Sequence, residues 1–259
     1  MIHSSSLISP KAKIGNNVTV GPFCYIHDNV TLGDDCYLDS HVTLGSTTGE
    51  VVIGKNNKFY GGSVIGGPPQ DLKYKGEKTR LVIGDNNTMR ESVTISIGTA
   101  QSIGETKIGN NNLIMAYCHI AHDNTLGNYN VLANLLQLAG HVTIEDRVTI
   151  GGLSAVNQFV RLGKNSFIAG ASMVNKDVLP FSIAQGNYAT VRATNKIGLN
   201  RSGMSEETIS QINRAIRILT KGSSGVEEAL TRIKTECEPL PEIHYLYEFA
   251  KSSTRGLAL

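Results

Sequence analysis

Residues 108–132 read IGNNNLIMAYCHIAHDNTLGNYNVL, and an aliphatic residue returns at every sixth position of this stretch. The same spacing continues without a break to residue 174. Its members are Ile108, Ile114, Ile120, Leu126, Leu132, Leu138, Ile144, Ile150, Val156, Leu162, Ile168 and Val174. A period of six does not fit an α-helix, which repeats every ~3.6 residues. It is typical of a short strand and a tight corner, with one aliphatic side chain pointing inward from each flat face.

Two further runs keep this spacing nearer the N-terminus. They are Ile8, Ile14, Val20, Ile26, Leu32, Leu38 and Leu44, then Ile53, Phe59 and Ile65, and then Ile83, Met89 and Ile95. Glycine and then Asn or Asp often follow the aliphatic residue, and these residue types tolerate the left-handed backbone conformation of a tight corner. Three flat faces make one coil of 18 residues, so we predict a parallel β-helix of hexapeptide repeats. A β-sandwich with accidental spacing is the alternative.

The pattern changes twice within the repeats and again after residue 186. Stretches near 66–82 and 96–107 leave the hexad, and we expect them to form loops on one side of the solenoid. Beyond them, apolar residues recur at helical spacing in three groups: Ile209, Ile212, Ile216 and Leu219; Val226, Leu230 and Ile233; Ile243, Leu246 and Phe249. Ser205 is placed to cap the first helix, with Gly222 just past its end. We therefore predict a β-helix over 1–186 and a C-terminal three-helix domain over 187–259.

Composition narrows the class of protein. The net charge of +2 is too small to indicate a nucleic-acid partner. The four cysteines form no CxxC pair, so neither a zinc ribbon nor a disulfide framework is indicated, and Cys24 and Cys36 are expected to be small buried residues. The chain lacks an apolar run of membrane-spanning length and a signal-peptide pattern, so we expect a cytoplasmic protein.

The 18-residue coil predicts a cluster of polar residues from neighbouring coils. One column holds His122, Gly140 and Gln158, the column beside it holds Asp123, His141 and Phe159, and His119 precedes His122 by three residues. Convergence of these groups favours a functional site over solvated surface histidines. Apolar residues on both faces of 112–118, together with Leu135 and Leu136, lie off the ladder, so we expect another subunit to cover that face.

Two kinds of chemistry fit this cluster. In acyl transfer, His122 can remove a proton from an acceptor hydroxyl, and the corner position makes contact with Asp123 possible. Gly140 has no side chain to block a backbone N–H pointing at an oxyanion, although spacing alone favours a simple turn glycine. Zinc-dependent carbonic anhydrases of the hexapeptide class are the rival, but their histidines resemble an H-x4-H spacing, unlike His119-x2-His122. We expect no metal and no cofactor.

Five short motifs, spread over most of the chain, are distinctive enough to indicate a family. They are His119-Ile120-Ala121-His122-Asp123, Leu138-Ala139-Gly140-His141, Gln70-Asp71-Leu72-Lys73-Tyr74, Ala184-Gln185-Gly186-Asn187 and Ser253-Thr254-Arg255-Gly256. The sequence resembles the acyl-[acyl-carrier-protein]–UDP-N-acetylglucosamine O-acyltransferases of lipid A biosynthesis. The resemblance implies a left-handed β-helix and a homotrimer with intersubunit sites. It also implies transfer of a (3-hydroxy)acyl chain from acyl carrier protein to the glucosamine 3-hydroxyl of UDP-N-acetylglucosamine.

The resemblance also implies roles for individual residues. His122 would be the general base, Asp123 its support, and the Gly140 N–H the oxyanion donor. Substrate contacts are implied for Gln70, Asp71, Lys73, His119, His141, Gln158, Gly170, Asn195 and Arg201, of which Gly170 would line the acyl groove and the last two would hold the nucleotide. On the first predicted tail helix, Arg214, Arg217 and Lys221 either contact acidic acyl carrier protein or form a solvated face.

The chain departs from the family pattern at four places. Ser96-Ile97 stands where the family has His-Arg, Asn157 where it often has His, Tyr188 where it has His, and Ser202 where a second arginine usually follows. These departures leave the implied base and oxyanion donor untouched but bear on nucleotide binding. N-acylation of a 3-amino sugar therefore stays open beside O-acylation. A related N-acyltransferase carries an extra domain before its first coil, whereas the hexad here starts at Ile8.

Overall fold

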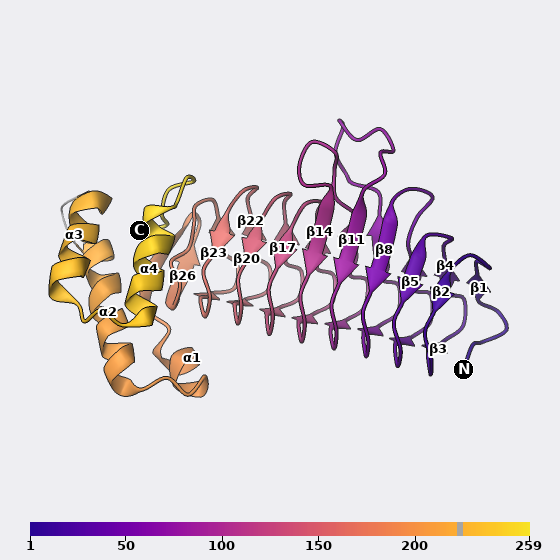
Figure 1. Cartoon of the computed structure of the whole chain (residues 1–259), viewed down its shortest axis with the longest axis horizontal. Helices are drawn as coiled ribbons and strands as arrows, with labels where there is room; N and C mark the ends of the chain where they lie inside the picture. Colours follow the sequence, from indigo (N-terminus) through magenta and orange to yellow (C-terminus); the bar gives the residue numbers. More distant parts are fainter. Residues whose placement is uncertain (222–224) are drawn as a thin grey trace.

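The computed structural model describes residues 1–221 and 225–259. Short parallel strands stack into a solenoid with three flat faces, drawn from indigo to pink in Figure 1, and a group of helices closes its C-terminal end. The strand register advances by one coil at a time, so that His119 pairs with Gln137 and Ile120 with Leu138. The predicted parallel β-helix is confirmed.

Each face is one sheet. The first face consists of β1 (Leu7–Ile8), β4 (Tyr25–Ile26), β7 (Thr43–Leu44), β10 (Val64–Gly67), β13 (Thr94–Ser96), β16 (His119–Ile120), β19 (Gln137–Leu138), β22 (Ala155–Val156) and β25 (Met173–Val174). The second face consists of β2 (Lys13–Ile14), β5 (Val30–Leu32), β8 (Glu50–Ile53), β11 (Arg80–Ile83), β14 (Glu105–Ile108), β17 (Thr125–Leu126), β20 (Thr143–Ile144) and β23 (Arg161–Leu162). The third face consists of β3 (Thr19–Val20), β6 (Tyr37–Leu38), β9 (Lys58–Phe59), β12 (Thr88–Met89), β15 (Leu113–Ile114), β18 (Val131–Leu132), β21 (Thr149–Ile150), β24 (Phe167–Ile168), β26 (Ser182–Gly186) and β27 (Ala189–Thr194).

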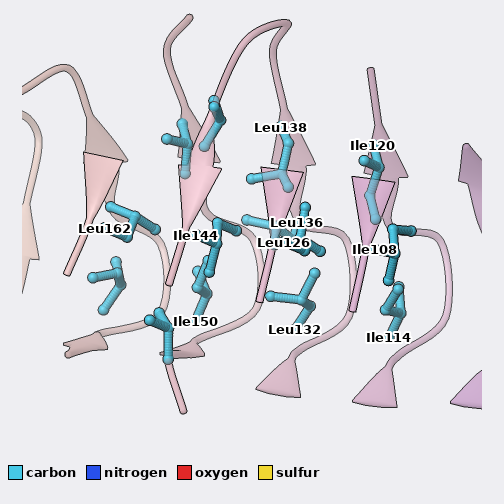
Figure 2. Packing of buried hydrophobic residues seen from close by; sticks show 14 of the residues in the cluster. Ile108, Ile114, Ile120, Leu126, Leu132, Leu136, Leu138, Ile144, Ile150 and Leu162 are labelled. Atoms are coloured by element: carbon cyan, nitrogen blue, oxygen red, sulfur yellow. The ribbon is translucent and has the colours of Figure 1, made fainter. Parts of the chain in front are cut away.

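The aliphatic ladder forms the core of the solenoid, and Figure 2 shows its side chains filling the space between the faces. The expectation of one inward residue per face was incomplete. From Val18 onward, the residue two positions before each ladder residue is also buried, as Val142 is before Ile144, because side chains of an extended strand at i and i+2 point the same way. Leu136 is such a residue and is fully buried, so its assignment to an outward, subunit-covered face was wrong.

A left-handed residue turns the chain at almost every corner. Asn111, Tyr117 and Asp123, at consecutive corners, have φ values of 58°, 61° and 59°. The conformation is not reserved for Gly, Asn or Asp, because hydrogen bonds to the coil below fix the turn. The Asn111 N–H, for example, donates to the Asp85 carbonyl at 2.9 Å. Stacking therefore supports a backbone conformation that most side chains disfavour in isolation.

Asparagines stack inside the corner between the second and third faces. Asn87 lies between Asn57 and Asn112, and each side-chain oxygen accepts from the backbone and side-chain N–H groups of the asparagine one coil further on. All three are buried. The Asn112 oxygen in turn accepts the backbone N–H of Asn130 at 2.9 Å. The column satisfies polar groups that the narrow coil would otherwise bury without partners.

Departures from the hexad all occur at one corner, between the first and second faces, which we call the loop corner. The chain leaves the coil there between β7 and β8, between β10 and β11, and between β13 and β14. The last two segments rise as the long loops above β11 and β14 in Figure 1. Strands β11 and β14 begin at Arg80 and Glu105, two residues before the predicted loop ends, because Leu81 and Thr106 already point into the core.

The C-terminal part begins with an antiparallel pair, β26 and β27, at the end of the third face. Four helices follow: α1 (Lys196–Arg201), α2 (Glu206–Lys221), α3 (Val226–Glu236) and α4 (Pro241–Lys251). The last three match the predicted helices, whereas the short α1 and the strand pair were not predicted. Ser205 caps α2 by accepting the Thr208 N–H at 3.2 Å, and the predicted stop at Gly222 lies outside the described residues. The division at residue 186 stays a prediction.

Within the described ranges, the helices are too short or too polar to cross a bilayer.

Candidate active site

His122 and Asp123 follow β16 at the loop corner. The left-handed φ of Asp123 turns its side chain back beside that of His122, whereas neighbouring side chains in a strand diverge. The Nδ1 atom of His122 lies 2.7 Å from Oδ2 of Asp123. The Asp123 side chain is fully buried, and that of His122 is 13% exposed. The carboxylate can only accept, so Nδ1 carries the hydrogen of the neutral imidazole and Nε2 keeps its lone pair.

Two threonines that the sequence analysis did not single out hold Asp123. Thr99 donates its backbone N–H to Oδ1 at 3.0 Å and its hydroxyl to Oδ2 at 2.6 Å. The backbone N–H of Asp123 donates to the hydroxyl oxygen of Thr106 at 2.8 Å. Because the 96–107 excursion interrupts the 18-residue count, no predicted column could include these threonines. The Gly-Thr that the chain keeps in an otherwise altered family motif was the one available signal.

Gly140 lies one coil above His122 and against its ring. A Cβ atom added to Gly140 would lie 2.7 Å from Cε1 and 2.9 Å from Nε2 of His122. The φ of Gly140 lies outside the left-handed region, so the turn does not require glycine there; the close approach of the ring does. The Gly140 N–H donates no hydrogen bond to any group in the described parts of the chain. This donor is available to a ligand beside the imidazole.

His141 and Phe159 extend the cluster along the corner. The Nε2 atom of His141 lies 3.9 Å from Oδ2 of Asp123, and its ring meets that of His122 edge-on with centroids 5.1 Å apart. Phe159 stacks on His141 at 4.5 Å with the two planes 10° apart. Burial lowers the pKa of His141, and the negative charge of Asp123 opposes this shift. A neutral His141 can hydrogen-bond a substrate without adding positive charge beside His122.

His119 faces outward from β16, before the corner. Its Nδ1 atom lies 2.7 Å from the hydroxyl oxygen of Thr94 on β13. Burial is the main cause that lowers the pKa of His119, and proximity to His122 lowers it further. His119 is therefore also neutral near neutral pH and suited to hydrogen bonding.

The first excursion carries Gln70, Asp71 and Lys73. The Asp71 carboxylate accepts the Lys73 N–H at 2.9 Å, which fixes the turn of the loop tip. The negative charge of Asp71 acts on the pKa of His141, whereas the side chains of Gln70 and Lys73 are exposed. The second excursion supports the first, since the Gln101 side chain donates to the Lys73 carbonyl at 3.5 Å. Both loops therefore belong to the surroundings of the histidine cluster.

The remaining predicted substrate residues lie elsewhere in the single chain, except Gln158, which is exposed one coil above Gly140. Gly170 is at the corner between the third and first faces, where an added Cβ would lie 3.3 Å from the Gly152 carbonyl oxygen. Asn195 caps α1 by accepting the Gly198 N–H at 3.2 Å, and Arg201 is exposed at the end of that helix. One chain does not bring these three together with His122.

One group within the described residues has the donor atoms for a metal ion: His122, Asp123 and His141, all within 4.8 Å of one another. The carboxylate of Asp123, which such an ion would need as a ligand, is already engaged. Both Asp123 oxygens accept from Thr99, and Oδ2 also faces Nδ1 of His122. A metal would have to displace these contacts, so the residues present fit a hydrogen-bonded histidine–aspartate pair better than a zinc site.

Comparison with known proteins identifies the family. Residues 11–46 match the bacterial transferase hexapeptide model (six repeats), and residues 177–258 match the model of UDP-N-acetylglucosamine O-acyltransferase, domain 2. The acyl-[acyl-carrier-protein]–UDP-N-acetylglucosamine O-acyltransferase of Janthinobacterium sp. (strain Marseille) is 45% identical over 99% of this chain and 98% of its own. The chain belongs to this acyltransferase family.

Solved structures of the O-acyltransferase family have the same fold as this chain. The enzyme from Bacteroides fragilis superposes with a TM-score of 0.95 at 40% identity, covering 99% of both chains. That from Acinetobacter baumannii gives 0.95 at 40% identity, covering 100% of this chain and 99% of its own. The left-handed parallel β-helix that the resemblance implied is confirmed by these matches, as is membership of the acyltransferase class.

Two of the four departures from the family motifs have structural explanations. Ser96 and Ile97 are buried, and Ile97 packs where an added Cβ on Gly49 would lie, so the substituted pair fills the base of the excursions. Ser202 ends α1, and its hydroxyl donates to the Leu199 carbonyl at 2.7 Å. Tyr188 is 62% exposed at the β26–β27 turn. Nothing in the single chain explains Tyr188 or Asn157, which is also exposed.

Proposed function

We propose that this protein transfers a (3-hydroxy)acyl chain from acyl carrier protein to the 3-hydroxyl of UDP-N-acetylglucosamine, the first step of lipid A biosynthesis. The single observation that carries the proposal beyond family membership is the His122–Asp123 pair beside the Gly140 N–H. The pair is a base with a fixed tautomer, and the N–H is an unpartnered donor next to it among the described residues. Acyl transfer to a hydroxyl needs these two groups.

The geometry supports the following course of reaction. Nε2 of His122 accepts the proton of the sugar hydroxyl while the hydroxyl oxygen attacks the thioester carbonyl carbon. The Gly140 N–H donates to the carbonyl oxygen as it becomes negative. The tetrahedral intermediate collapses with cleavage of the carbon–sulfur bond, and the imidazolium returns the proton to the thiolate. Asp123 stabilises the imidazolium while it exists.

The chemistry of the substrates agrees with the surroundings of His122. Asp71, Lys73, His119, His141 and Gln158 offer hydrogen-bonding groups along the loop corner and its loops for a sugar nucleotide. Asn195 and Arg201, which the single chain leaves apart from His122, would contribute to nucleotide binding from a neighbouring subunit, and Gly170 to an acyl groove between subunits.

Exposed apolar side chains support a homotrimer. Tyr117, Leu135 and Leu153 project from the corner between the third and first faces in three successive coils and are 58%, 44% and 66% exposed; Phe23, at the same corner nearer the N-terminus, is 61% exposed. A row of this kind along one edge of a solenoid is typical of a subunit interface. We propose that this edge lies against the neighbouring subunits and that each site is completed between chains.

A basic groove supports docking of acyl carrier protein. The groove between α2 and α3 has a volume of about 440 Å³, and Arg214, Arg217, Lys221 and Arg232 line it. Glu236 bridges Arg214 and Arg232, which leaves the groove with an excess of positive charge. An acidic protein surface fits such a groove.

Acyl carrier protein thioesters and nucleotide sugars are made in the cytoplasm, which is where we expect the protein to act.

The test is acyl transfer by purified protein. A panel of acyl carrier protein thioesters of different chain length is incubated with UDP-N-acetylglucosamine, with and without EDTA, using wild type and His122→Ala. We expect an ester product, unaffected by EDTA and reduced at least about 1000-fold by the substitution. An amide formed only on the 3-amino sugar would replace the O-acyl assignment, and zinc-dependent activity would overturn acyl transfer by the histidine–aspartate pair.

A further inference from the structure

The second excursion holds the side chain of Asp123 through Thr99. Thr99 is buried, and two of its donors, the backbone N–H and the hydroxyl, reach the two different oxygens of the Asp123 carboxylate. A carboxylate held at both oxygens cannot rotate about its last bond without breaking a hydrogen bond. Since Oδ2 also faces Nδ1 of His122 at 2.7 Å, the orientation of the imidazole depends on that of the carboxylate.

The residues just before Thr99 are held by hydrogen bonds to the preceding coil and its excursion. The Thr79 hydroxyl donates to the Gly98 carbonyl at 2.6 Å, and the Gly98 N–H donates to the Arg80 carbonyl at 3.1 Å. The Ile97 N–H donates to the Gly67 carbonyl at 3.0 Å. Gly98 also allows no side chain, because an added Cβ would overlap the backbone nitrogen of Glu105. The two excursions therefore clamp the residue next to Thr99.

We propose that Thr99 is a positioning residue, which fixes the Asp123 carboxylate and through it the tautomer and direction of the His122 base. The inference rests on the proposed function, since it assigns His122 the role of base. The Thr99 hydroxyl shares Oδ2 with His122, so it also draws electron density from the oxygen that faces the imidazole. Loss of the hydroxyl would leave Thr99 holding the carboxylate at Oδ1 alone, with Oδ2 less restrained and a stronger acceptor toward Nδ1.

The experiment compares Thr99→Val, Thr99→Ser and Thr79→Val in the acyl-transfer assay. Valine keeps the shape and the backbone N–H of Thr99 but removes the hydroxyl. We expect kcat to fall by about 10- to 100-fold with KM for the sugar nucleotide within about threefold, and the acidic limb of the pH–rate profile to move to higher pH. Serine should restore kcat to within about threefold, because it keeps the hydroxyl.

Thr79→Val is the matched control, because it removes a buried hydroxyl bond to the same loop without touching Asp123. Because Thr79 helps to hold Gly98, we expect a fall in kcat smaller than that of Thr99→Val, with no shift of the pH–rate profile. A fall equal to that of Thr99→Val would attribute the effect to loop integrity and overturn the assignment. So would a Thr99→Val enzyme with unchanged kcat and pH profile.

A double mutant of Thr99 and Asp123 distinguishes a positioning role of Thr99 from an effect on folding. In an Asp123→Asn background, Thr99→Val should cost less than about twofold further, since the carboxylate on which it acts is gone. If the fold-losses in kcat of the two single variants multiply in the double variant, the proposal is contradicted. If Thr99→Val does not fold, Thr99→Ala, which cannot clash, takes its place in both backgrounds. Failure of the proposed function would be recognised separately, as an absence of acyl transfer by the wild type itself.

Discussion

The backbone of Gly140 lies against the ring of His122, so closely that a single added methyl group would be 2.7 Å from Cε1. The two residues are 18 positions apart and meet only because consecutive coils stack in register. The contact places an N–H with no acceptor among the described residues beside the ring that we assign as the base. It also makes glycine necessary at residue 140 for reasons of space rather than of backbone conformation.

Gly140→Ala should therefore inactivate the enzyme without unfolding it. The backbone of residue 140 accepts an L-residue, but the new methyl group would push the His122 ring away from Asp123. We expect kcat to fall by about 100-fold or more, the size of loss that follows displacement of a catalytic group by about 1 Å. Thermal unfolding should change little. Gly225→Ala, where an added Cβ meets nothing within 4 Å, is the control and should retain activity.

The partly buried side chain of His119 should make the protein less stable in mild acid. Burial lowers the pKa of His119 below its ordinary value of 6.5, so the unfolded chain takes up a proton before the folded chain does. Stability from the neutral side chain is thus complete above pH 6.5 and lost as the pH falls through that value toward the folded-state pKa. Thermal unfolding of His119→Gln at about pH 7 and about pH 5 should show a smaller difference than wild type. An unchanged difference would contradict the assignment; His3→Gln, at an exposed site, is the control.

A buried asparagine of the column should contribute more to the free energy of unfolding than Asn110, which makes comparable hydrogen bonds near solvent. Asn112→Ala would leave the Gly127 carbonyl and the Asn130 N–H without their partners in the core. We expect a loss of about 3 kcal/mol in the free energy of unfolding, measured with urea. Asn110→Ala removes comparable bonds to Asp85 and Asn128 near solvent, where water can replace them, and should cost about 1 kcal/mol. Equal losses would argue against the column as a source of stability.

The cysteines should be inert in the folded protein. All four are free and buried, and burial raises the pKa of Cys118 to about 11. The thiolate is the reactive form, so a thiol reagent at neutral pH should label none of them in the native state and all four after unfolding in guanidinium chloride. Rapid labelling of the native protein would show that a cysteine is more accessible than its position indicates.

The repeat made much of this structure predictable. The ladder from Ile108 to Val174 required a coil of fixed length, and a fixed length is enough to place Gly140 above His122. It did not reveal the second inward position of each face, because Cys, Ser, Asn, Val and Leu all occupy it, as Leu136 and Asn112 illustrate. It also did not reveal α1, which is only six residues long and has one buried residue, Leu199.

The solenoid, the column positions of the histidines and the family were predictable from the order of residues, because a strict spacing and short motifs are local properties of the chain. The way in which Asp123 meets His122, and the contacts that hold it, became visible only in the folded chain. The first depends on a left-handed corner that stacking imposes, and the second on Thr99, which arrives from an excursion that follows no repeat. A loop outside the period has no predictable place, because its position is set by contacts with other coils rather than by spacing.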